Sequence, residues 1–140
     1  MSKDDAMEGT SGFGKRVPPG ASQHSTAGPY SPVLEISGKR IVAISGQAAI
    51  NPDGKIVGAT LQEQTEQTIA NCSRQLASAG CGLEDVFKVT VYLTDLSAWG
   101  DFNTVYAKLM PEPRPVRTAV QVGLLPGLLV EIEMWAIVRE

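Results

Sequence analysis

The sequence has few of the residues on which thiol, histidine and metal chemistry depend. Its 140 residues include two cysteines, Cys72 and Cys81, and a single histidine, His24. Two cysteines at this spacing fit neither a disulfide scaffold nor a zinc site. One histidine argues against a Ser-His-Asp triad and against multi-histidine metal centres. We therefore expect no bound metal.

Long apolar runs and a surplus of basic residues are also missing. No run approaches the roughly 20 apolar residues of a membrane-spanning helix. The first residues lack the charged-then-apolar order of a signal peptide, so a cytoplasmic location is expected. Twelve basic and 15 acidic residues leave a net charge of −3. Nucleic-acid binding requires a clustered basic face, so neither a nucleic acid nor a membrane is an expected partner.

The chain divides into an arm and one domain. Residues 1–27 are rich in glycine, serine, proline and charge and lack apolar periodicity, which predicts a flexible N-terminal arm. Residues 28–140 are long enough for a single core.

The first half of the domain predicts two strands and a helix. Residues 33–36 and 40–46 are β-rich and indicate a hairpin. Thr60 and Glu63 have the spacing of a helix capping box. The apolar stripe that follows has helical spacing and indicates a buried face made of Leu61, Thr65, Ile69, Cys72, Leu76 and Ala79.

The second half predicts a strand, a helix and two more strands. Strands are expected over 86–94, 116–122 and 129–138, and a helix over 98–110 that ends at two prolines. The aromatic face of this helix is interpreted as core rather than as a cofactor site. The order β-β-α-β-α-β-β predicts an α+β sandwich with both helices on one face of a mixed sheet.

Strand alternation predicts which side chains share a face. Arg117 shares a face with Ala119, and Glu131 shares one with Glu133 and Trp135. Two helices on one side leave the other side open, and we expect Arg117 and the glutamates there. An open face with a tryptophan beside charges is typical of a subunit interface.

Three charged side chains are candidates for chemistry. The planar fork of Arg117 matches a carboxylate, although spacing alone slightly favours a structural ion pair with Glu131 or Glu133. Arg114 lies between prolines in a loop, where we expect a solvated side chain. One of the glutamates could act as a general base on water, or both could form interface salt bridges.

Three polar segments are weaker candidates. Tyr30 lies in a Gly-Pro-Tyr-Ser-Pro segment that could fix its hydroxyl, or that could be an ordinary turn with a packed aromatic. Ser45 and Gly46 follow a strand and could offer backbone N–H groups to an anion. Asn103 falls on the second helix, where an exposed asparagine usually has no function.

Taken together and in this order, the motifs resemble the RidA (YjgF) family of imine and enamine deaminases. The resemblance extends over residues 27–139. It is carried by residues 28–31 (GPYS), 44–47 (ISGQ), 51–54 (NPDG), 89–93 (VTVYL), 95–96 (DL), 115–117 (PVR), 125–126 (LP) and 130–133 (VEIE).

The resemblance implies a fold, an assembly and an activity. It implies a chorismate-mutase-like fold and a homotrimer with clefts between subunits. The implied reaction needs no cofactor and hydrolyses reactive 2-imino or 2-enamino acids, such as 2-aminoacrylate, to 2-keto acids and ammonia.

The resemblance also implies roles for particular residues. Arg117 would bind the substrate carboxylate, and Tyr30 and Glu131 would engage the catalytic water or the imine nitrogen. Ser45, Gly46 and Asn103 would line the same cleft.

Two alternatives stay open. A larger enamine acid, such as an aminomuconate, would keep the chemistry, and a non-catalytic carboxylate-binding protein would keep only the arginine. Many family members have cysteine where this chain has Ala119, so thiol regulation at the site is not expected.

Overall fold

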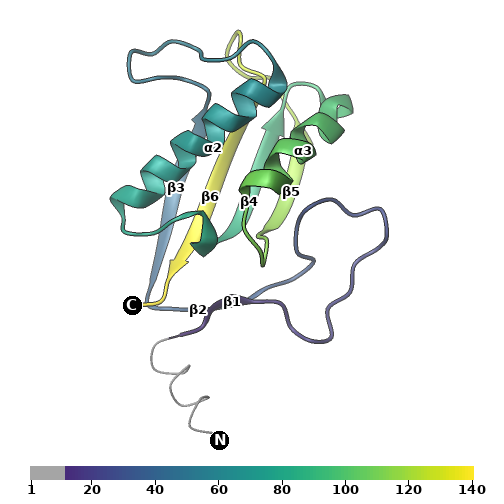
Figure 1. The fold of residues 1–140 in the computed structure, drawn as a ribbon, viewed down its shortest axis with the longest axis vertical. Coiled ribbons are helices and arrows are strands. Elements are labelled where there is room, and N and C mark those ends of the chain that lie inside the picture. Colours follow the sequence, from purple (N-terminus) through teal and green to yellow (C-terminus); the bar gives the residue numbers. More distant parts are fainter. Residues whose placement is uncertain (1–11) are drawn as a thin grey trace, which may run out of the picture.

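The computed structural model describes residues 12–140 as a four-stranded sheet with two helices on one face (Figure 1). The order of the strands is β3-β6-β4-β5. The central strand β6 runs antiparallel to both of its neighbours, while β4 and β5 are parallel. The bounds are β3 Arg40–Ala48, β4 Val86–Leu93, β5 Val116–Gln121 and β6 Val130–Val138. The predicted α+β architecture with a mixed sheet is confirmed.

Helix α2, Leu61–Ser78, begins at the predicted capping box. The Thr60 hydroxyl accepts a hydrogen bond from the Glu63 amide at 3.1 Å, and the Glu63 carboxylate accepts one from the Thr60 amide at 3.0 Å. Gly80, at φ 78°, follows the helix in the left-handed conformation that glycine adopts without strain. The sequence therefore specifies both ends of α2 locally.

The second helix, α3, spans Trp99–Leu109 after a short 3-10 turn, η2, at Leu96–Ala98. Another 3-10 turn, η1 at Leu83–Asp85, precedes β4. Figure 1 shows α2 and α3 side by side on the sheet, with α3 over β4 and β5. Phe102 and Tyr106 are fully buried, which agrees with the interpretation of the aromatic face as core.

One hydrophobic core fills the space between the helices and the sheet. Each Å² of apolar surface removed from water stabilises the fold by about 25 cal/mol. Cys72 belongs to the core, and burial raises its pKa to about 12, so its thiol stays protonated and unreactive. The buried cluster contains Ile69, Cys72, Leu76, Val86, Val89, Val91, Leu93, Phe102, Tyr106, Met110, Val130, Ile132, Met134 and Ala136.

The predicted hairpin of residues 33–36 with residues 40–46 is wrong. β2, Glu35–Ser37, instead pairs with β1, Gly14–Arg16, in a separate two-stranded sheet. The chain turns at Gly38, where a Cβ atom would lie 2.6 Å from Ile137 Cγ1 and 2.7 Å from the Val138 carbonyl oxygen. β3 pairs with β6 instead, as the outermost strand of the four-stranded sheet, and has no pairing with β2.

Part of the predicted N-terminal arm is structured. β1 lies inside the segment 1–27 that was expected to be flexible, and the Lys15 ammonium group donates to the Val86 carbonyl at 2.5 Å. The Arg139 side chain donates to the Gly12 carbonyl at 3.1 Å. Residues 1–11, the first part of the predicted flexible arm, lie outside the described part of the chain.

The sheet face away from α2 and α3 is open in the described chain. Its side chains include Ile41, Trp135 and Val120, which are 63%, 45% and 36% exposed. Phe87 meets Trp135 edge-on at 6.5 Å between ring centroids. A second layer is therefore absent from this face within residues 12–140. No helix in that range is long and apolar enough to cross a membrane.

Candidate functional site

Arg117 lies on the face of β5 that the helices cover. The parallel register pairs it with Val89 and pairs Ala119 with Val91, and both valines belong to the core. The expectation that Arg117 shares the open face with the glutamates is therefore wrong. The alternation argument assumed that the apolar residues Val116 and Val120 face the core. In this edge strand they point away from it.

The Arg117 guanidinium is enclosed by aromatic rings. Its Cζ atom lies 4.7 Å from the ring centroid of Tyr106, 5.0 Å from those of Tyr30 and Trp99, and 5.6 Å from that of Phe102. Each such cation–π contact contributes about 0.5–2 kcal/mol. The rings therefore offset part of the cost of burying the charge, but they accept no strong hydrogen bonds.

None of the Arg117 side-chain nitrogens has a hydrogen-bond partner among residues 12–140. All three are buried, and desolvation lowers the pKa of Arg117 from its usual value. The ion pair with Glu131 or Glu133 that the sequence left open is absent from the described chain. Each unsatisfied buried donor costs about 1–3 kcal/mol. An anion with two acceptor oxygens would remove most of that cost.

Two further predicted residues converge on this arginine. A Cβ atom placed on Gly28 would lie 3.2 Å from Tyr30 Cε2, 3.3 Å from Arg117 Nη2 and 3.3 Å from Asn103 Nδ2. The Asn103 amide oxygen is buried and has no partner in the described chain. Tyr30, Asn103 and Arg117 therefore form one cluster, and the absence of a side chain at position 28 leaves room for it.

A pocket opens beside this cluster at the N-terminal ends of β4 and β5. Its volume is about 290 Å³, which is ample for a three- or four-carbon acid. No carboxylate lines it, so an anion would meet no like charge. The lining residues are Gln23, Tyr30, Ser31, Pro32, Lys88, Val89, Val116, Arg117 and Thr118.

The other predicted residues form a second cluster on the open face. A Cβ atom on Gly46 would collide with the Glu131 carboxylate, so that carboxylate lies directly against the Gly46 backbone. β3 has a register shift between Ile44 and Gln47, which displaces Ser45 and Gly46 from regular pairing with β6. Ser45, Gly46 and Glu131 therefore lie together.

The two glutamates differ in their partners. Glu133 accepts a hydrogen bond from the Tyr92 hydroxyl at 2.7 Å, which raises the pKa of Tyr92. The Glu131 side chain has no hydrogen bond or ion pair within the described residues. Of the two, Glu131 is the carboxylate available to a ligand or to water.

The two clusters cannot meet within one chain. Glu131 is on β6 and Arg117 is on β5, with β4 between them, so they lie about 10 Å apart across the strands. Because Arg117 is level with Met134, they also lie about 10 Å apart along the strands. They also point to opposite faces of the sheet. A ligand bound to Arg117 can therefore reach a Glu131 carboxylate only if that carboxylate belongs to a second copy.

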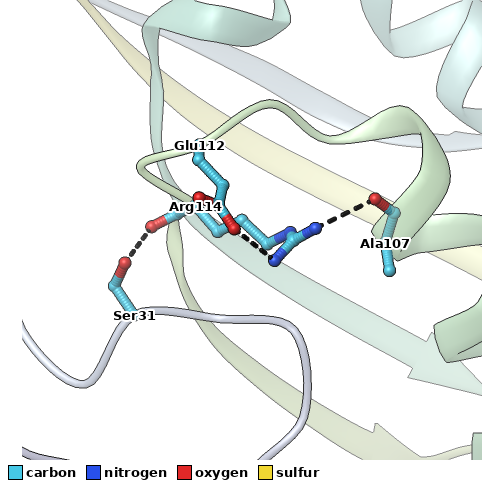
Figure 2. A network of polar contacts seen from close by, with 4 residues as sticks. All are labelled: Ser31, Ala107, Glu112 and Arg114. Atoms are coloured by element: carbon cyan, nitrogen blue, oxygen red, sulfur yellow. Dashed lines mark hydrogen bonds and ion pairs between the residues drawn. The ribbon is translucent and has the colours of Figure 1, made fainter.

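Sequence reasoning missed two features of the arginine cluster. It treated Trp99, Phe102 and Tyr106 only as core, although their i, i+3, i+7 spacing also marks one helix face that can surround a side chain. It also expected Arg114 to be solvated. Instead, the Arg114 side chain is 25% exposed and bonds Glu112 and the Ala107 carbonyl (Figure 2). Within residues 12–140 no group of three metal-binding side chains occurs.

The fold and this geometry define a class: a small α+β protein whose two-helix sandwich carries a sheltered, unpaired arginine at the edge of the sheet. Residues 21–138 match the family model described as Endoribonuclease L-PSP. The chain belongs to this family, which includes proteins named Rid and YjgF. The resemblance seen in the sequence is thereby confirmed.

Individual relatives agree along most of their length. Protein mmf2, mitochondrial, of Schizosaccharomyces pombe is 40% identical over 122 residues, covering 84% of this chain and 94% of the yeast protein. A mouse protein named 2-iminobutanoate/2-iminopropanoate deaminase is 37% identical over 112 residues, covering 79% of this chain and 82% of its own. YyfB from Yersinia pestis, a Rid-family protein of unknown function, has a crystal structure that superposes with a TM-score of 0.74 at 28% identity, covering 90% of this chain and 100% of its own.

The names of these proteins differ in activity and location. Deaminase and endoribonuclease names both occur in the family. The fission-yeast protein is named as mitochondrial, so the cytoplasmic location expected from the sequence stays a prediction.

Proposed function

We propose that this protein hydrolyses 2-imino and 2-enamino acids to 2-keto acids and ammonia. The observation that carries the proposal is the Arg117 guanidinium, which is buried, enclosed by four rings and without a hydrogen-bond partner in the described chain. A carboxylate is the anion that matches its planar fork. The name of the mouse relative supports the choice of substrate class.

Arg117 binds the substrate carboxylate through two parallel hydrogen bonds. The aromatic walls exclude water, which strengthens these charge-assisted bonds and fixes the adjacent C=N carbon in one place. Asn103 and Tyr30 lie beside the guanidinium and contact the imine end of the substrate. No cofactor is needed, because the protonated imine is itself the electrophile.

The chemical step is addition of water followed by loss of ammonia. Glu131 takes a proton from water as the oxygen bonds to the imine carbon, and the C=N electron pair moves to the protonated nitrogen. The protonated Glu131 then gives its proton to the nitrogen of the resulting carbinolamine. The C–N bond breaks and ammonia leaves, while the hydroxyl proton passes to the Glu131 carboxylate as C=O forms. Ser45 and Gly46 form the wall that holds Glu131 in place.

The Glu131 carboxylate of this step comes from a neighbouring copy, because within one chain it lies on the other face of the sheet. A homotrimer with three clefts, each with Arg117 from one subunit and Glu131 from the next, provides this arrangement. The exposed apolar residues of the open face support such an assembly.

The first experiment generates 2-aminoacrylate in situ and follows pyruvate release. Arg117→Ala should lower kcat/KM roughly 10- to 100-fold, because two charge-assisted hydrogen bonds are lost. Glu131→Gln should lower kcat and change KM less. Equal rates for the unmodified protein and Arg117→Ala would refute the proposal.

A mixing experiment tests whether the site is shared between copies. Arg117→Ala and Glu131→Ala chains, each expected to have strongly reduced activity alone, are refolded together at equal amounts. Random pairing should restore about a quarter of the sites, those that combine an intact arginine with an intact glutamate. No recovery in mixed assemblies would place both residues of each site in one chain.

A second substitution of the arginine, Arg117→Met, controls for loss of folding. Arg117→Met removes a buried, unpaired charge and keeps an apolar stem, so the melting temperature should stay the same or rise. Loss of activity in that variant therefore cannot reflect unfolding.

One observation favours a second candidate function, a non-catalytic carboxylate-binding protein. A single chain presents the complete arginine cluster but keeps its free glutamate on the opposite face. Keto-acid binding that survives Glu131→Ala, with no substrate consumed by the unmodified protein, would establish that function instead. A larger enamine acid as substrate would appear as a preference in the same deaminase assay.

A further inference from the structure

A network of polar contacts lies beside the arginine cluster and touches every segment that encloses it. Figure 2 shows its centre, Arg114. The Arg114 Nη2 atom donates to the Ala107 carbonyl at 3.1 Å, and Nη1 donates to the Glu112 carboxylate at 3.0 Å. The Arg114 carbonyl accepts a hydrogen bond from the Ser31 hydroxyl at 2.5 Å.

The contacts with Ala107 and Ser31 each lead to one wall of the Arg117 pocket. Ala107 is the residue after Tyr106, so its bond holds the last turn of α3 where a ring packs on the guanidinium. Ser31 is the residue after Tyr30, and its amide also donates to the Pro115 carbonyl at 3.1 Å. Val116 then begins β5, which carries Arg117 itself.

Arg117 depends on these walls for its own position. Its nitrogens make no hydrogen bond in the described chain, so only ring packing holds the fork in place. A two-bond contact with a carboxylate tolerates little misalignment, and a shift of about 1 Å at a site can cost two orders of magnitude in rate. The loop with Tyr30 lies outside the helix–sheet core, so the core does not fix it.

We propose that Ser31 and Arg114 are positioning residues that join α3, the Tyr30 loop and β5 and so set the geometry of the Arg117 fork. Arg114 does not line the pocket, and the hydroxyl of Ser31, which does line it, donates to the Arg114 carbonyl. In the proposal both residues act through Tyr30, Tyr106 and Arg117. The inference rests on the proposed function for the identity of the ligand, a 2-keto or 2-imino acid.

The structure supplies a matched control at Glu112. Its ion pair with Arg114 is at the surface, with the glutamate side chain 75% exposed, and such pairs contribute little. Glu112→Gln removes this pair and leaves the bonds to the Ala107 carbonyl and from Ser31 unchanged. A role for Arg114 as a mere surface ion pair would be lost in this variant, whereas a positioning role would survive.

The test compares Ser31→Ala and Arg114→Met with Ser31→Thr, Arg114→Lys and Glu112→Gln, all in a Trp135→Phe background. That background leaves Trp99, at the guanidinium, as the one tryptophan, so its fluorescence reports on the site. Acrylamide quenching is measured without ligand, pyruvate affinity by titration, and kcat and KM by pyruvate release from 2-aminoacrylate.

Loss of one or two hydrogen bonds should weaken pyruvate binding and raise KM about 3- to 10-fold in Ser31→Ala and Arg114→Met, with kcat changed less. Quenching of Trp99 should rise in the same two variants. Ser31→Thr and Arg114→Lys should recover most of the affinity, and Glu112→Gln should match the background protein, with similar melting temperatures throughout.

Quenching and affinity that stay unchanged in Ser31→Ala and Arg114→Met would overturn the inference, whether or not the protein turns over substrate. So would equal effects of Glu112→Gln and Arg114→Met. Pyruvate binding with the expected variant pattern but no turnover would instead support the positioning role and reject the deaminase proposal. An unmodified protein that binds no pyruvate would reject both.

Discussion

Arg117 and Lys15 are two sheltered cations that the fold treats differently. Arg117 is surrounded by rings and has no hydrogen-bond partner in the described chain, so its unmet donors point to an external anion. The Lys15 ammonium group donates to the Val86 carbonyl and lies near Asp85 and Glu84. Its partners are internal, which indicates a structural role in fixing β1.

Lys15 predicts a specific pH dependence of stability. Burial lowers its pKa from 10.5 to about 8, and the nearby Asp85 and Glu84 oppose this only in part. Below pH 8 both folded and unfolded chains carry the charge, so the burial cost is fully present. Between about 8 and 10.5 the unfolded chain binds more protons than the folded one, and this cost falls as pH rises.

The measurement is urea unfolding of the unmodified protein and of Lys15→Met on both sides of pH 8. The difference in unfolding free energy should shift in favour of the unmodified protein as pH rises above 8 and should be constant below it. Contributions from other titrating groups are the same in both proteins and cancel in the difference. A difference that is flat across the whole range would contradict the role of Lys15.

At the scale of elements, α2 shows how local chemistry defines a boundary. The Glu63 carboxylate accepts bonds from the Thr60 and Ala59 amides, and these bonds lower the pKa of Glu63. The Thr60 hydroxyl in turn accepts a hydrogen bond from the Glu63 amide. Amides of the first turn that would otherwise lack partners are thus satisfied by residues within the same few positions.

Thr60→Ala should lower the free energy of unfolding by about 1 kcal/mol, because the side-chain acceptor of the cap is lost. Chemical denaturation measures this change. Thr60→Ser keeps the hydroxyl and should lose less than half as much. Because the cap is remote from Arg117, the KM of both variants should equal that of the unmodified protein.

The predictable parts of this fold are those whose causes are local in sequence. The capping box, the buried stripe of α2 and the prolines after α3 each act over a few residues, and the structure has each of them. The partner of β2 depends on β1, which is some twenty residues away across the loop of residues 17–34. No local pattern identifies such a partner, so the hairpin was mispredicted.

The site divides in the same way. The family resemblance pointed to Tyr30, Asn103 and Arg117, and the structure brings them together. The face of Arg117 was mispredicted because alternation defines two sets of residues but not which set faces the core. In β5 that choice depends on parallel pairing with β4, which only the tertiary structure shows.

At the scale of the whole molecule, the open sheet face is the feature that a single chain does not explain. Trp135 and Ile41 are large apolar side chains that a stable monomer rarely leaves together on one face. The proposed assembly covers them and supplies Glu131 to the neighbouring pocket. Stability and activity should therefore depend on the same contact.

Trp135→Glu places a charge in that face and should convert the assembly to monomers, with loss of deaminase activity and an unchanged far-ultraviolet circular dichroism spectrum. Light scattering coupled to size-exclusion chromatography measures the mass. Ala77→Glu, on the exposed side of α2, is the matched control and should change neither mass nor activity. An unmodified protein that is monomeric and fully active would contradict the proposed shared site.

The close approach of Gly46 to Glu131 also bears on how this sequence can diverge. Any side chain at position 46 would push against the end of a flexible carboxylate rather than against backbone. The fold would absorb such a change with little loss of stability, while the carboxylate would move from its place. Glycine at position 46 is therefore required by the position of the Glu131 carboxylate, which the proposed function uses, and not by the backbone of the fold.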